Sequence, residues 1–154
     1  MKRSWQDFAR AEPEFAAFGE TRLKNGPAYL ATVRADGSPR VHPVTPIIGE
    51  GHLFLFMEPT SPKGHDLRRG SGYALHCSVS DNNGGEGEFS LTGHAVLTDD
   101  PTMRELAARY GYEPKAIYVL FELTVESASS TIYSGSGLPV RKNWKILATG
   151  NINS

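Results

Sequence analysis

The sequence has little cysteine and no strong excess of one charge. Cys77 is the single cysteine among 154 residues, so an intramolecular disulfide and a thiolate metal cluster are both excluded. Sixteen Lys and Arg residues stand against 17 Asp and Glu residues, which gives a net charge of −1 at pH 7. We therefore expect no nucleic-acid partner and no attraction to an anionic membrane surface.

Long hydrophobic runs are also missing. The apolar run over residues 53–57 is far too short to span a bilayer, and the first residues carry charge without the apolar stretch of a signal peptide. These features predict a cytoplasmic protein with no membrane partner. The composition, 39% hydrophobic and 21% charged, is close to the average for globular proteins, and the length predicts one domain over residues 1–154.

Three segments carry helix signals. Aromatic residues at helical spacing predict one or two short helices over residues 4–24, within an N-terminal helical segment 1–26. Asp100 as N-cap and Pro101 at the first helical position predict a helix over residues 100–110. Ser61, Pro62 and a terminating glycine predict a shorter helix over residues 62–69.

Between these helices the hydrophobic pattern changes to a period of two, which indicates strands. The expected strands cover residues 27–34, 40–48, 52–57, 73–79, 89–97, 117–125 and 129–133. Pro43 and Pro46 require the second of them to be an edge strand or to bend, because proline donates no ladder hydrogen bond. The predicted fold class is mainly β, a barrel of six to seven antiparallel strands with short flanking helices and a tail over residues 135–154.

The segment 59–70 carries the clearest chemical signal. Its predicted helix begins at Ser61 and Pro62, and free N–H groups in a first turn favour an anion. Lys63 lies in that turn, where a cation opposes the helix dipole, so an anion such as phosphate is one interpretation and a solvated surface lysine is the other. Arg40 is a second cation that a hairpin of the second and third strands would bring toward Lys63.

A hairpin strand that starts at Arg40, then an apolar strand, then Thr60-Ser61-x-Lys63-x-His65-x-Leu67 resembles the FMN-binding split-barrel family typified by pyridoxamine 5'-phosphate oxidase. The resemblance covers roughly residues 27–134. It implies a split β-barrel that forms a homodimer with FMN at the subunit interface, and it assigns Arg40 and Lys63 to the phosphate. The other cofactor-binding residues that it implies are Val41, His42, Pro43, Val44, Thr45, Phe56, Met57, Ser61, Pro62, Tyr133 and Trp144.

The sequence departs from the family pattern at three places. The C-terminal motif that grips pyridoxal phosphate is replaced by the run at residues 138–144, and Ser61-Pro62-Lys63 has one cation fewer than the family's run. Glu88 stands where the oxidase has a glutamine near the flavin. We therefore expect the fold and the cofactor to transfer, but not pyridoxamine phosphate oxidation. For Trp144, packing of the tail onto the barrel is an equal alternative to a cofactor contact.

The resemblance implies an FMN-dependent oxidoreductase that transfers hydride through the flavin, with a small-molecule substrate or electron donor. The deazaflavin F420 is the alternative cofactor. A second hypothesis is a module that binds flavin, F420 or haem without turnover, and a third is a structural dimer with an empty groove. The five histidines lack the paired spacing of metal ligands, so we expect no metal site.

Overall fold

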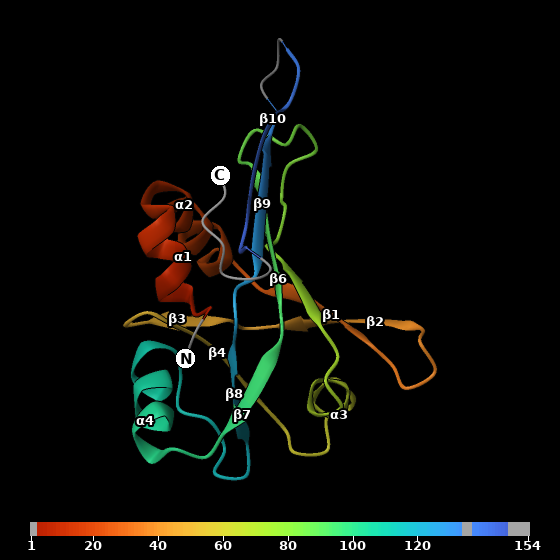
Figure 1. Ribbon diagram of the computed structural model, residues 1–154, viewed down its shortest axis with the longest axis vertical. Helices are drawn as coiled ribbons and strands as arrows, with labels where there is room; N and C mark the ends of the chain where they lie inside the picture. Colours follow the sequence, from red (N-terminus) through yellow and green to blue (C-terminus); the bar gives the residue numbers. More distant parts are fainter. Residues whose placement is uncertain (1–2, 134–136, 148–154) are drawn as a thin grey trace.

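The computed structural model describes residues 3–133 and 137–147 (Figure 1). The helices are α1 (Trp5–Ala11), α2 (Pro13–Lys24), α3 (Pro62–Arg68) and α4 (Pro101–Tyr110). The strands are β1 (Ala28–Val33), β2 (Pro39–Val44), β3 (Ile47–Gly49), β4 (His52–Met57), β5 (Tyr73–His76), β6 (Glu88–Gly93), β7 (Ala95–Thr98), β8 (Val119–Leu123), β9 (Ser127–Ile132) and β10 (Val140–Lys145). All the helices that the sequence predicted are present. No helix in the described part of the chain is both long enough and apolar enough to cross a membrane.

Every strand pair is antiparallel, and the strands form two sheets. The larger sheet has the order β10-β9-β6-β5-β1-β2, and the smaller has the order β3-β4-β8-β7. The predicted fold class, a mainly β antiparallel split barrel with short helices, is confirmed. The strand number is higher than the predicted six or seven, because two predicted strands each divide between the sheets and a further strand follows in the tail.

Two breaks in the chain produce this division. The predicted strand 40–48 separates into β2 and β3 at Thr45-Pro46, and β2 lies at the edge of the larger sheet, as its prolines require. The predicted strand 89–97 separates into β6 and β7 next to Gly93. A Cβ atom at Gly93 would lie 2.3 Å from the carbonyl oxygen of Thr124, so only glycine allows this close crossing.

The strand predicted at residues 73–79 is shorter, because β5 ends at His76. Cys77 is buried as expected, but Val79 was predicted to share its face and is 42% exposed. Part of the predicted tail is a strand instead: β10 pairs with β9 and places Trp144 opposite Ala128.

The main core lies between the two sheets and under the N-terminal helices. Phe8 of α1 is fully buried and contacts Phe15 at a ring-centroid distance of 5.5 Å. Trp144 packs on Phe8 at 5.0 Å, which joins the tail to the core. Burial of these large aromatic side chains removes apolar area from water and holds α1 and α2 on the larger sheet.

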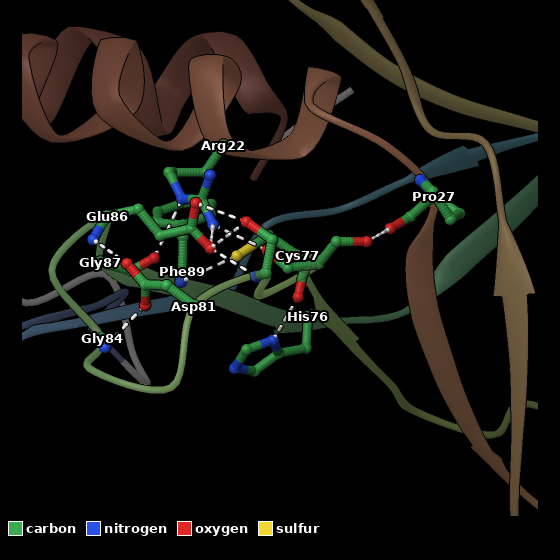
Figure 2. A network of polar contacts seen from close by, with 11 residues as sticks. Arg22, Pro27, His76, Cys77, Asp81, Gly84, Glu86, Gly87 and Phe89 are labelled. Carbon is green, nitrogen blue, oxygen red and sulfur yellow. Dashed lines mark hydrogen bonds and ion pairs between the residues drawn. The ribbon is translucent and has the colours of Figure 1, made fainter.

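Arg22 attaches α2 to the loop between β5 and β6 (Figure 2). Its Nε donates to the carbonyl oxygen of Gly87 at 2.9 Å, and its Nη2 donates to the carbonyl oxygen of Ser78 at 2.7 Å. Glu86 lies 3.4 Å from the same Nη2 and completes an ion pair. Arg22 is buried, and these contacts satisfy its charge inside the protein.

Candidate functional site

A cavity of about 390 Å³ lies where the ends of β2 and β4 meet the start of α3. Its volume is within the range of small-molecule sites. Nine of the predicted site residues line it: His42, Pro43, Val44, Thr45, Phe56, Met57, Ser61, Pro62 and Lys63. In the chain, β3 and β4 separate residues 42–45 from residues 61–63. The fold brings the two segments together around one cavity.

The start of α3 packs closely on the end of β4. Gly64 allows this approach, because a Cβ atom there would lie 3.1 Å from the Sδ atom of Met57. Ser61 is the N-cap, as predicted, but its hydroxyl does not cap the helix and instead accepts a hydrogen bond from Lys63. Gly70 follows the helix with φ +95°, which confirms it as the predicted stop.

Lys63 is the cation of this cavity. Its Nζ donates to the Oγ of Ser61 at 3.0 Å, and within residues 3–133 and 137–147 it forms no ion pair. Burial lowers the pKa of Lys63, while the nearby carboxylate of Glu58 acts in the opposite direction. A partly buried ammonium group beside a hydroxyl can bind an anionic group of a ligand.

Arg40 lies beside α3 but in a neighbouring cavity, which shares Pro62 with the first. Its Nε donates to the Oδ2 of Asp66 at 2.7 Å. The predicted hairpin between the second and third strands was wrong for this residue, because β2 pairs with β1 over its whole length. Arg40 instead contacts α3, the helix that carries Lys63, through Asp66.

Asp66 is buried, with 1% of its surface exposed. It also accepts hydrogen bonds from Thr32 at 2.7 Å and from Arg69 at 2.5 Å. Burial alone would raise the pKa of Asp66, but the hydrogen bonds from Arg40, Thr32 and Arg69 outweigh it and lower the pKa to about 2. The carboxylate therefore stays ionised and holds both arginines.

The sequence did not predict three residues that line the cavity, Glu58, Tyr112 and Tyr118. Glu58 directly follows β4, and the two tyrosines lie in the irregular segment between α4 and β8. Tyr112 contacts Phe56 edge to face, with ring centroids 5.6 Å apart. A pair of tyrosines after a terminating glycine is a weak signal, and it gives no indication of which strands the segment faces.

The remaining predicted site residues do not line this cavity. Val41 is 68% exposed on β2, and Trp144 packs against the core. The backbone N–H of Tyr133 donates to Gly84 in the loop between β5 and β6. Glu88 pairs with Thr131 in the larger sheet and is not among the cavity residues either.

Comparison of the sequence with protein-family models finds no match, and comparison with curated proteins finds none. Solved structures do match. PhzG from Burkholderia lata, in complex with tetrahydrophenazine-1-carboxylic acid, has a TM-score of 0.65 at 13% identity, and the match covers 96% of this chain and 90% of that chain. A candidate pyridoxamine 5'-phosphate oxidase from Lactobacillus delbrueckii has a TM-score of 0.58 at 23% identity, with 71% and 90% covered.

A heme binding protein from Mycobacterium smegmatis is also similar, with a TM-score of 0.62 at 17% identity. That match covers 82% of this chain but 57% of the other, so this chain spans little more than half the length of that protein. At these identities the similarity establishes a shared fold.

Proposed function

Because the chain has the split-barrel fold of the pyridoxamine 5'-phosphate oxidase-like proteins, we propose that it is an FMN-dependent oxidoreductase. In this proposal FMN occupies the cavity at the start of α3, and the protein forms a homodimer with the flavin at the subunit interface. The substrate and the electron donor are small molecules. Bound FMN supplies hydride-transfer chemistry, and the protein supplies placement and electrostatics.

The observation that carries the proposal is Lys63. This partly buried ammonium group faces the cavity without a carboxylate partner among the described residues, and its contact is the hydroxyl of Ser61. A phosphate monoester supplies the missing negative charge and accepts hydrogen bonds from both groups. Arg40 lies in the adjacent cavity, where its charge is paired with the carboxylate of Asp66, so Lys63 is the cation left for the phosphate.

The rest of the cavity suits a ring system. The end of β2 provides an extended segment at residues 42–45, which can border the edge of an isoalloxazine through backbone groups. Phe56 and Met57 provide apolar surface beneath it. His42 is exposed and lines the cavity, and its Nδ1 lies 2.9 Å from the carbonyl oxygen of Pro43, so its Nε2 is the ring nitrogen available to a ligand.

The first experiment is an absorption spectrum of the purified protein, followed by mass spectrometry of what a denaturant releases. The proposal predicts flavin bands in the visible range and a released mass equal to that of FMN. If the protein is colourless, FMN is titrated into it. A protein that binds no FMN at millimolar concentration contradicts the proposal.

The variant Lys63→Ala tests the phosphate assignment. Loss of a charge-assisted hydrogen bond weakens FMN binding by about 1.5–3 kcal/mol, or roughly 10- to 150-fold in Kd. The matched control is Lys24→Ala, because Lys24 is an exposed lysine of α2 that pairs with Glu20. Equal affinity in Lys63→Ala and Lys24→Ala would count against Lys63.

The similarity to a heme binding protein favours one second candidate, a module that binds flavin, F420 or haem without turnover. The discriminating measurement is anaerobic reduction of the FMN-loaded protein. Electrons accepted from NAD(P)H or reduced F420 support the oxidoreductase, while a bound cofactor that neither donor reduces supports the module.

A further inference from the structure

One wall of the cavity comes from the irregular segment 111–118 that joins α4 to β8. Tyr112 and Tyr118 face the cavity from this segment, and Tyr112 meets Phe56 edge to face at an interplanar angle of 68°. Within the described part of the chain, neither phenol hydroxyl takes part in a hydrogen bond. Both hydroxyls are therefore free to pair with a ligand.

Arg104 of α4 holds this segment in place. Its Nη1 donates to the carbonyl oxygen of Tyr118 at 2.6 Å, and its Nη2 donates to the carbonyl oxygens of Lys115 at 3.2 Å and Ala116 at 3.4 Å. Its Cζ also lies 5.4 Å from the ring centroid of Phe56. The guanidinium group of Arg104 thus contacts both the backbone of Tyr118 and the ring of Phe56 on β4.

Segment 111–118 has few backbone hydrogen bonds of its own, so the contacts with Arg104 are important for its position. It forms neither helix nor strand before Tyr118, and the backbone bond from Tyr118 N to Lys115 O closes one turn. A lysine at position 104 would provide a point charge but not the planar fork that reaches several carbonyl oxygens at once. Loss of the fork would free the backbone that carries Tyr118. Tyr112 depends on Arg104 through Phe56, whose ring both side chains contact.

We infer that Arg104 is a positioning residue that fixes Tyr112 and Tyr118 as the ligand-selecting wall of the cavity. This wall suits a ligand with a planar aromatic ring system that carries hydrogen-bond acceptors. The ring system would contact the tyrosine rings, and its acceptor atoms would accept hydrogen bonds from the two hydroxyls. This inference rests on the proposed function, because FMN is the probe that reports on the wall.

The experiment compares Arg104→Gln and Arg104→Lys with the control Arg109→Gln. Arg109 lies on the same helix but is exposed, pairs with Glu50 and does not line the cavity. Three quantities are measured on the full chain: amide hydrogen exchange of Tyr118, whose N–H donates to the carbonyl oxygen of Lys115, without ligand; the Kd for FMN; and the unfolding midpoint. We expect both Arg104 variants to exchange faster in this segment and to bind FMN about tenfold more weakly or worse, at an unfolding midpoint close to that of Arg109→Gln.

Two results overturn the inference. One is equal hydrogen exchange in Arg104→Gln and Arg109→Gln, which would show that Arg104 does not hold the segment. The other is faster exchange with an unchanged Kd, which would show that the segment is not part of the binding site. A parent protein that binds no FMN overturns the proposed function instead, and the exchange data still decide whether Arg104 fixes the segment.

Discussion

Asp66 joins three elements through one carboxylate: β1 through Thr32, β2 through Arg40, and its own helix α3 through Arg69. The Oδ2 atom accepts from Thr32 and Arg40, and the Oδ1 atom accepts from Arg69. Because α3 also carries Lys63, this carboxylate helps to set where the cavity's cation lies. Its importance is for the position of the helix rather than for contact with a ligand.

Substitution Asp66→Asn should lower the free energy of unfolding by roughly 1–3 kcal/mol, because two arginines lose the charge that pairs them. The measurement is urea unfolding at pH 7. Asp99→Asn serves as the control, since Asp99 is exposed and precedes the cap of α4. Equal losses in the two variants would contradict the role assigned to Asp66.

The same residue predicts a pH dependence. Its folded-state pKa is lowered to about 2 from an ordinary value of 3.8, so its contribution to stability is present above the unfolded-state pKa. That contribution disappears as the pH falls from the unfolded value through the folded one. The stability difference between the parent and Asp66→Asn should therefore shrink between about pH 5 and pH 2. A difference that stays constant over this range would count against the low pKa.

Single residues differ in how well the sequence predicted them. Lys63 and Ser61 were predicted because a helix start has a local signature of N-cap and proline, and the structure places both in the cavity. No prediction from the sequence concerned Asp66. Its burial depends on partners 34 and 26 residues earlier in the chain, which no local pattern shows.

At the scale of elements, the crossing of β6 into β7 depends on Gly93. Its position leaves no space for a side chain, because a Cβ atom would also lie 2.8 Å from the Oγ1 of Thr124 and 2.9 Å from the ring of Tyr73. The nearest atom is a backbone carbonyl oxygen, which cannot turn away as a side chain can. The two sheets therefore meet at a fixed distance here.

Gly93→Ala should destabilise the protein by about 1–3 kcal/mol, as expected for overpacking a close contact. Gly85→Ala is the control, because a Cβ atom at Gly85 would meet its nearest neighbour at 3.8 Å, an ordinary van der Waals distance. The control should change stability by no more than about 0.5 kcal/mol. Thermal and urea unfolding of both variants provide the comparison, and a tolerated Gly93→Ala would refute the close crossing.

The sequence predicted the elements better than their assembly. Helix caps and period-two strands are local patterns, so the four helices and most strand positions agree with the structure. The division of two strands between the sheets was missed, because an extended chain keeps the same alternation across a break. Pro46 and Gly93 lie at or beside those breaks, but their effect depends on neighbours from distant parts of the chain, such as Thr124.

At the scale of the whole molecule, the proposed homodimer needs an apolar surface. The outer face of β1 and β2 offers one: Tyr29 is 45% exposed, Val33 47% and Val41 68%. The register places Val41 beside Ala31, so these side chains lie on one face of the larger sheet. Apolar side chains gathered on one sheet face are typical of a protein interface.

Val33→Lys should weaken such a dimer at least about tenfold, because it buries an unpaired charge. Val96→Lys is a closely matched control, since Val96 is 48% exposed but belongs to the smaller sheet. Analytical ultracentrifugation over a concentration series measures both variants. A parent that sediments as a monomer at all concentrations, or equal weakening by the two substitutions, would contradict this interface.

The edge position of β2 has one further consequence. β2 has proline at positions 39 and 43. The backbone nitrogens of both prolines lie on the side away from β1, where another strand would have to add, and neither nitrogen carries a hydrogen to donate. Val41 lies between the two prolines, and its N–H group is the donor that remains among these three positions. Another strand that adds to this edge of β2 finds few N–H donors. Assembly into fibrils is therefore disfavoured at this side of the barrel, even at high protein concentration.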